Sequence, residues 1–173
     1  MANTAADIQK LYIAYFNRPA DAAGLKYWMD SSMSVKDIAK SFGVQDEYKA
    51  AFAGQTTESI ISTLYKNLFG ADRVVDAAGL LYWVGQVQSG KSTIADVAIN
   101  IVSGATTGTD AASIAAKVTA ATAFTNALDL GTEIVAYVKP AGMTAGKAWL
   151  SAVTTDVSAA AQIAKLDATP TLL

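Results

Sequence analysis

The residues best suited to ligand chemistry stand in one connector. Arg18 and Asp21 are three positions apart, and Asp21 is placed to open a helix. A guanidinium beside a carboxylate at a helix N-terminus can hold a ligand hydroxyl or carboxylate. Tyr27, further along the same helix, adds an aromatic ring with a hydroxyl group. These residues also have a structural interpretation, in which Arg18 braces the turn and Asp21 caps the helix.

Other residue sets that could carry chemistry match their motifs less well. The segment 85–92 matches the letters of a phosphate-binding loop, but that loop follows a strand, and 80–84 continues a predicted helix. Asp72 and Asp76 offer oxygen ligands for calcium, although their spacing matches no calcium loop. Asp21 and Asp76 stand at equivalent helix starts, which favours capping over the acid pair of a glycosidase. We therefore predict no enzyme, no catalytic residue, no metal site and no required cofactor.

Composition excludes further classes of function. The 173 residues include no cysteine and no histidine, which removes disulfides, thiolate metal sites and the commonest general base. The net charge is −2, so nothing provides the basic face that nucleic acids require. No apolar run approaches the roughly 18 residues of a membrane span. We predict that the chain neither binds nucleic acid nor spans a membrane.

The elements that must position the connector occur twice. The aromatic block that runs from Leu11-Tyr12 to Tyr27-Trp28 recurs from Leu64-Tyr65 to Tyr82-Trp83. The offset grows from 53 to 55 residues along the block, so the second connector is two residues longer. Loops tolerate such insertions and packed faces do not, which is typical of two copies of one helical unit. At the matched connector position the second copy is interpreted as lacking the arginine, although Arg73 is nearby.

Helical spacing and capping residues predict an all-α fold. The first helix is expected to begin at Thr4 and to be ended by Pro19, and the second is expected to begin at Asp21. Further helices are expected over 34–43, 46–52, 57–69, 76–87, a stretch from 93, 109–130, 133–138, 145–153 and 157–166. Pro140-Ala141-Gly142 is expected to separate two of them. Gly24 and Gly79, inside matching helices, predict a close approach to the preceding helix.

These elements define the predicted organisation. A two-copy helical repeat covers 1–104, with units at about 1–54 and 55–104. A C-terminal helical part over 105–166 packs on the repeats, and 167–173 forms a linker or tail. Concave sites form at such junctions, so a binding groove is expected where the repeat units meet the C-terminal helices. We predict Arg18, Asp21 and Tyr27 as its lining residues.

The aromatic block resembles a known family. The pattern Leu-Tyr-x-x-x-Phe-x-Arg-x-Ala-Asp-x-x-Gly-Leu-x-Tyr-Trp, from Leu11 to Trp28, is similar to a bacterial family of repeated helical domains of uncharacterised function. Together with Phe124-x-x-Ala127-Leu128-Asp129, the chain resembles the N-terminal region of S-layer and RTX-type proteins exported by type I secretion. A C-terminal secretion signal in such proteins would account for the lack of cysteines and of an N-terminal signal peptide.

The resemblance implies a function. In S-layer proteins of this kind the N-terminal helical region anchors the protein to lipopolysaccharide on the outer membrane. We therefore expect an extracellular anchoring module that binds the O-antigen glycan non-covalently through Arg18, Asp21 and Tyr27. The alternative is a structural self-assembly module, in which Ala- and Thr-rich helices pack against copies of the chain in a surface lattice or against another protein.

Overall fold

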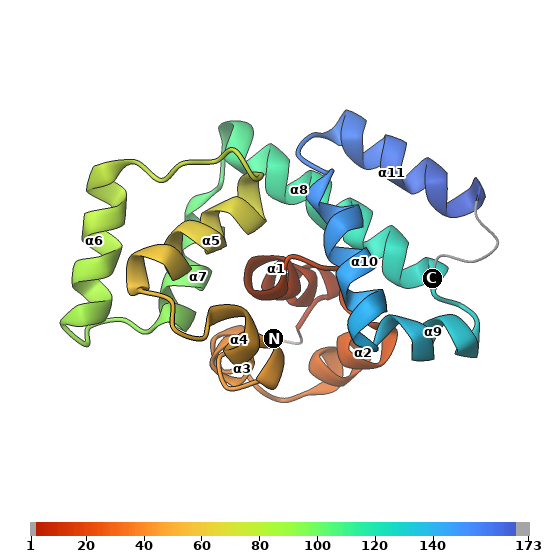
Figure 1. Ribbon diagram of the computed structural model, residues 1–173, viewed down its shortest axis with the longest axis horizontal. Coiled ribbons are helices and arrows are strands. Elements are labelled where there is room, and N and C mark those ends of the chain that lie inside the picture. Colours follow the sequence, from red (N-terminus) through yellow and green to blue (C-terminus); the bar gives the residue numbers. More distant parts are fainter. Residues whose placement is uncertain (1–2, 169–173) are drawn as a thin grey trace.

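The computed structural model describes residues 3–168, and every regular element in that part of the chain is an α-helix (Figure 1). The predicted all-α class is confirmed. The helices are α1 (Ala5–Phe16), α2 (Ala22–Asp30), α3 (Val35–Phe42), α4 (Asp46–Phe52), α5 (Thr57–Phe69), α6 (Ala77–Gln88), α7 (Ile94–Gly104), α8 (Gly108–Ala127), α9 (Gly131–Tyr137), α10 (Pro140–Ser151) and α11 (Asp156–Ala168). Within 3–168, none of these helices combines the length and the apolar character needed to cross a membrane.

Helix starts lie where capping chemistry predicts them. Thr4 and Asp7 form a reciprocal capping box at the start of α1. Asp21 accepts the backbone N–H of Gly24 at 2.7 Å, and Asp76 accepts that of Gly79 at 2.8 Å. A side-chain oxygen at the N-cap satisfies a backbone donor that the helix leaves unpaired. The structural interpretation of Asp21 as a cap is therefore confirmed.

Two predicted boundaries were wrong because backbone geometry intervened. The first helix ends at Phe16 and not at Pro19, because Asn17 adopts a left-handed conformation with φ 50°. Asparagine tolerates this conformation better than most residues. Pro140 was expected to separate helices, but it is the first residue of α10, where its missing N–H has no partner to lose.

The predicted tail also begins later than expected. Helix α11 continues to Ala168, so residues 167 and 168 are helical and do not belong to a linker. The remaining part of that prediction, 169–173, lies outside the described residues.

Helix α1 lies at the centre of the molecule and packs against α2, α3, α4, α5, α7 and α8 (Figure 1). Eight of its twelve residues are buried, as expected for a helix covered on all sides. Helix α5 packs on α6 and α7 in the way that α1 packs on α2 and α3. The three-dimensional equivalence of the two repeat units stays a prediction, which superposition of 11–28 on 64–83 tests.

The two predicted units meet through α1 and α5 and also through α3 and α7. Lys36 Nζ on α3 lies 2.7 Å from Asp96 Oδ1 on α7. The hydrogen bond from Lys36 and those within the Thr93 cap lower the pKa of Asp96 to about 2. Asp96 therefore serves both the cap of its own helix and the contact between units.

The long helix α8 is joined to the first unit by a buried polar network. Gln9 Nε2 donates to Thr125 Oγ1 at 2.9 Å, and Thr125 donates in turn to the Ala20 carbonyl at 2.7 Å. Gln9 Oε1 accepts the Ala20 backbone N–H at 3.0 Å. Because buried polar groups need partners, this network sets the position of α8 against the connector between α1 and α2.

Only one of the two repeated glycines makes the predicted close approach. A Cβ atom at Gly24 would collide with the Tyr12 hydroxyl on α1, so the contact is with a side chain and not with backbone. At Gly79 a Cβ atom would meet only the Asp76 cap, and the prediction was wrong there. The closest approach of backbone occurs at Gly142, where a Cβ atom would lie 2.6 Å from Tyr137 Cα.

Candidate functional site

The connector between α1 and α2 carries a buried arginine. Arg18 is 6% exposed, and its guanidinium lies over the rings of Tyr12 and Phe16, 5.1 and 5.6 Å from the ring centroids. The left-handed turn at Asn17 lets the chain reverse directly after α1. Aromatic faces attract a desolvated cation, so the aromatic stripe of α1 forms the floor beneath the charge.

The charge of Arg18 is balanced mainly by Glu47 at the start of α4. Arg18 Nε and Nη2 donate to the Glu47 carboxylate at 3.0 and 2.8 Å, and Nη1 donates to the Pro19 carbonyl at 3.1 Å. Asp21 Oδ2 is 4.0 Å from Nη1. Burial opposes the charge on Arg18, but the hydrogen bonds to Glu47 outweigh it, and the pKa of Arg18 lies above its ordinary value. Arg18 therefore braces the connector as a permanent cation.

Two residues of the C-terminal helices close this cluster. The ring of Tyr137 lies 5.7 Å from the Arg18 guanidinium, and its hydroxyl donates to the Pro19 carbonyl at 2.6 Å. Lys147 Nζ lies 3.4 Å from Glu47 Oε1. The connector thus lies where the repeat region meets the C-terminal helices, but the hollow beside it is lined by the first unit alone and not by those helices, as the expected groove would be. Neither residue, nor Glu47, had been predicted, because no local pattern links such distant segments.

A hollow of about 230 Å³ opens beside the Arg18–Glu47 pair, and we call it the first cleft. Its lining residues are Tyr12, Phe16, Arg18, Asp21, Trp28, Phe42, Gln45 and Glu47. Burial, followed by the charge of Asp21, raises the pKa of Tyr12 to about 12, so its phenol stays protonated. The cleft therefore combines hydroxyl, amide and carboxylate groups with aromatic rings, a combination suited to a ligand rich in hydroxyl groups.

Tyr27 does not lie in this cleft. Its side chain is 65% exposed and borders a shallow hollow beside Lys26 and Asp30. Neighbouring residues on a helix point about 100° apart, so Trp28 faces the cleft while Tyr27 faces away. The structure brings Arg18 and Asp21 together and separates Tyr27 from them. The expectation that Tyr27 lines the same groove was wrong.

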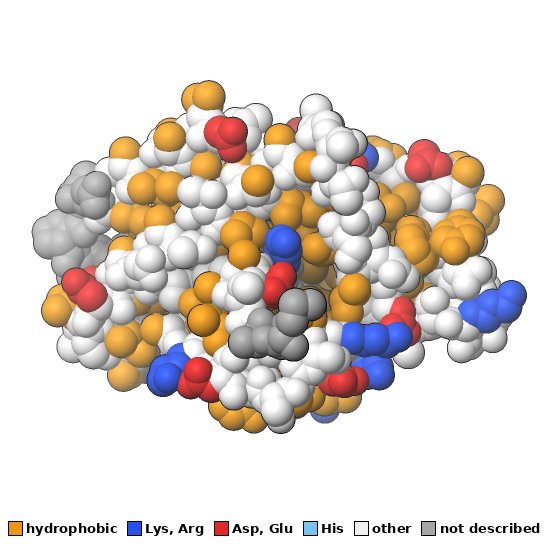
Figure 2. Space-filling model, turned by 180° about the vertical axis from the view of Figure 1, so that it is seen from behind, with side chains coloured by type: hydrophobic (Ala, Val, Ile, Leu, Met, Phe, Trp, Pro, Cys, Tyr) orange, Lys and Arg blue, Asp and Glu red, His pale blue; other side chains and the backbone are white. Residues whose placement is uncertain are grey.

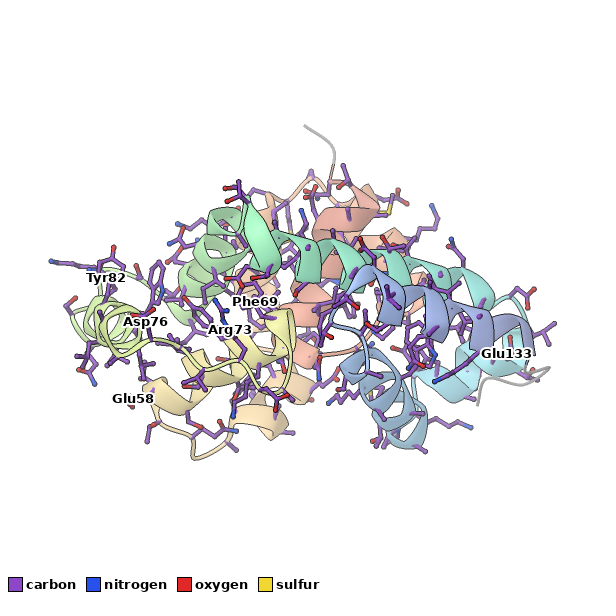
Figure 3. The ribbon with its side chains drawn as sticks, turned by 90° about the horizontal axis from the view of Figure 1, so that it is seen from above. Glu58, Phe69, Arg73, Asp76, Tyr82 and Glu133 are labelled. Carbon is purple, nitrogen blue, oxygen red and sulfur yellow. The ribbon has the colours of Figure 1, made fainter. Side chains whose placement is uncertain are left out.

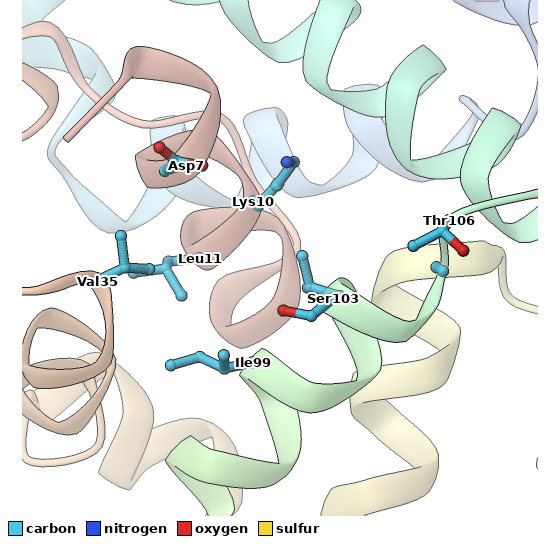
Figure 4. Close-up of a pocket in the computed structure, with 9 residues that line it drawn as sticks. Asp7, Lys10, Leu11, Val35, Ile99, Ser103 and Thr106 are labelled. Carbon is cyan, nitrogen blue, oxygen red and sulfur yellow. The ribbon is translucent and has the colours of Figure 1, made fainter. Parts of the chain in front are cut away.

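A separate hollow of about 300 Å³ lies between α1, α3 and α7 (Figure 4). Leu11, Val35 and Ile99 form apolar walls, and Asp7 and Lys10 supply charge (Figure 4). The reverse face of the molecule shows a hollow near its centre, with charged groups among hydrophobic ones (Figure 2). None of the predicted site residues borders the α1–α3–α7 hollow, and Asp7 is engaged in the Thr4 cap.

The structure also bears on the weaker motifs. Across residues 3–168, no three His, Cys, Asp or Glu side chains are grouped closely enough to hold a metal ion. Residues 80–88 belong to α6, and no strand precedes the segment 85–92. The interpretation of that segment as a helix end and turn, and not as a phosphate-binding loop, is confirmed.

Comparison with known families places one domain in the chain. Residues 39–106 match the family described as "Domain of unknown function (DUF4214)". This range begins within α3 and ends just after α7, so it contains the second aromatic block and not the first. Comparisons with curated proteins and with solved structures gave no significant match. The match agrees with the coarser part of the resemblance, a domain of uncharacterised function.

Proposed function

We propose that this chain is a cell-surface anchoring module of a secreted S-layer-like protein, and that it binds the glycan part of lipopolysaccharide non-covalently. The observation that carries the proposal is the first cleft. The Arg18–Glu47 pair, Asp21 and the Tyr12 hydroxyl line it together with aromatic rings. This proposal assigns the chain to the extracellular side of a bacterial surface.

The chemistry of the cleft favours a sugar. Each sugar hydroxyl both donates and accepts hydrogen bonds, and the apolar face of a pyranose ring packs on aromatic rings. The cleft volume of about 230 Å³ suits one sugar unit held from a longer chain. Asp21 holds a helix N-terminus and Glu47 pairs with Arg18, so neither carboxylate is free to act as an acid or base. These pairings favour binding over catalysis.

A binding experiment with Asp21→Asn tests the proposal. Asparagine caps a helix as well as aspartate does, so the variant removes charge from the cleft while retaining the fold. We expect the purified protein to bind host lipopolysaccharide, and Asp21→Asn to bind about fivefold more weakly, because a hydrogen bond to a charged group is worth about 1 kcal/mol more than a neutral one. Surface plasmon resonance on immobilised lipopolysaccharide measures both affinities.

The matched control is Asp76→Asn, which makes the same change at the cap of α6, away from the first cleft. It should bind as the unaltered protein does. Absence of binding by the unaltered protein, both with and without added calcium, would refute the anchoring function.

The second candidate function is self-assembly, which an exposed apolar surface favours. Val74, Leu81 and Tyr82 are 81%, 72% and 58% exposed, and α6 lies at the edge of the molecule (Figure 1). Tyr82 lies at the same edge of the molecule (Figure 3). Exposed apolar side chains of this kind are suited to contact with a second copy of the chain.

If self-assembly is the function, Leu81→Lys should lower the association of the protein in a concentration series measured by light scattering. Tyr27→Lys is the control, because it adds the same charge at an exposed site on α2. A protein that is monomeric throughout the series, and still binds lipopolysaccharide, would exclude this alternative.

A further inference from the structure

The second copy carries an arginine that corresponds to Arg18. Counted back from the cap aspartates, Arg18 stands three residues before Asp21, and Arg73 stands three residues before Asp76. The two extra residues of the longer connector therefore precede the arginine. The expectation that the second copy lacks a matching arginine was wrong. It aligned the two connectors from the end of the preceding helix, whereas the arginines match when the connectors are aligned from the cap aspartates.

Arg73 is also held in the same manner. Its guanidinium lies 5.3 Å from the ring of Phe69, beside which Figure 3 shows it, and its Nη2 donates to Asp110 Oδ2 at 2.7 Å. Asp110 belongs to the first turn of α8, the helix that follows the second unit. Glu47 belongs to the first turn of α4, which follows α3 in the same way. Each arginine is thus paired with an acidic residue in the first turn of the third helix that follows it, α4 for Arg18 and α8 for Arg73.

A second cleft, of about 250 Å³, lies beside this pair. Its lining includes Tyr65, Phe69, Trp83, Ile101 and Asp110. The first three are the repeat counterparts of the aromatic residues that line the first cleft. A further hollow of about 340 Å³ reaches Arg73 itself and shares Phe69 and Asp110 with the second cleft.

The two arginines differ in how completely they are engaged. Glu47 fills both Nε and Nη2 of Arg18, whereas Asp110 takes only Nη2 of Arg73, whose Nε is buried without a hydrogen-bond partner. The Arg73 side chain is 40% exposed, against 8% for Arg18. Among the described residues, no ring other than Phe69 lies over Arg73. The Nε atom is itself shielded from solvent, so a ligand would meet the exposed remainder of the Arg73 side chain.

We propose that the second cleft, together with the neighbouring hollow that reaches Arg73, is an open glycan site, in which the Arg73–Asp110 pair holds two neighbouring hydroxyl groups of a neutral pyranose. The guanidinium donates to one hydroxyl oxygen, and the other hydroxyl donates to the Asp110 carboxylate. The ring of the sugar packs against Trp83. The negative charge of Asp110 disfavours an anionic group at the same place. The inference rests on the proposed function and assigns the exchangeable site to the second unit, since the donors of Arg18 are already engaged.

The probe for this site is the lipid-free polysaccharide released from host lipopolysaccharide by mild acid. A second sample of it is oxidised with periodate, which cleaves neighbouring hydroxyl pairs, and then reduced. We expect the protein to bind the intact polysaccharide, and Arg73→Lys and Asp110→Asn each to weaken binding about tenfold or more. Oxidation should abolish binding. Asp76 lines neither the second cleft nor the hollow beside it, so the Asp76→Asn variant should bind the polysaccharide as the unaltered protein does.

The three tryptophans locate the bound sugar without relying on variants. Trp28 lines the first cleft, Trp83 the second, and Trp149 neither. In protein labelled with fluorinated tryptophan, addition of the polysaccharide should shift the resonance of Trp83. Binding that moves only Trp28, or that Arg73→Lys and Asp110→Asn leave unchanged, would overturn the second site while retaining the anchoring function. Absence of any binding by the unaltered protein would overturn both.

Discussion

Replacing Lys117 with methionine is expected to stabilise the fold by about 3 kcal/mol at neutral pH. Lys117 lies in α8, is 1% exposed, and forms no hydrogen bond or ion pair with any described residue. Burial alone lowers its pKa to about 8 from the ordinary lysine value of 10.5. At neutral pH the folded protein therefore holds a largely desolvated ammonium group, and methionine of similar length removes that cost.

The gain should depend on pH in a defined direction. Between about pH 8 and the unfolded value of 10.5, the unfolded chain binds a proton at Lys117 that the folded chain does not. The stability of the unaltered protein relative to Lys117→Met therefore rises with pH across that window, and is constant below it. Urea denaturation of both proteins at about pH 7 and about pH 10 measures the difference. An equal difference at both values would contradict the expectation, and Lys91→Met, at an exposed turn, is the control.

Replacing Arg18 with methionine is expected to destabilise the fold by about 3–5 kcal/mol. The change leaves the half-buried Glu47 carboxylate without its main partner and removes one of the two donors to the Pro19 carbonyl. The matched variant is Arg73→Met. Its ion pair with Asp110 is much more exposed and should contribute no more than about 1 kcal/mol.

Thermal and urea unfolding of the two variants gives the comparison. A double variant, Arg18→Met with Glu47→Leu, should recover part of the loss, because removing both charges leaves no unpaired carboxylate. Equal destabilisation by Arg18→Met and Arg73→Met would show that burial does not distinguish the two pairs. A double variant less stable than Arg18→Met alone would indicate that packing, and not the unpaired charge, causes the loss.

The sequence was sufficient for the all-α fold and for most helix starts. Asp21 and Asp76 could be identified as caps because the cap side chain and the backbone N–H that donates to it are only three residues apart in the sequence. The errors at helix ends have a related cause, because these ends do not follow from residue type at nearby positions. Ends that depend on a backbone conformation, such as the left-handed Asn17, leave only a weak trace in residue type.

The candidate site was only half predictable. Arg18 and Asp21 share one connector, so their proximity follows from the chain itself. Trp28 lines the cleft and Tyr27 does not, because neighbouring residues on a helix point about 100° apart and α2 buries the face that carries Trp28. Lys117 falls among the apolar positions of α8, and only packing on several sides reveals that it is buried.

The sequence by itself determined that the aromatic block and its capping aspartate occur twice, and it contains an arginine three residues before each aspartate, although the second arginine was not matched to the first when the connectors were counted from their start. Only the tertiary structure decided that the two arginines differ. Tyr137 and Lys147 come from helices that pack over the first connector, and Glu47 accepts from both Nε and Nη2 of Arg18. The shorter Asp110 engages a single donor of Arg73, which stays partly exposed. Such contacts join segments far apart in the chain, and their geometry exists only once the helices have packed.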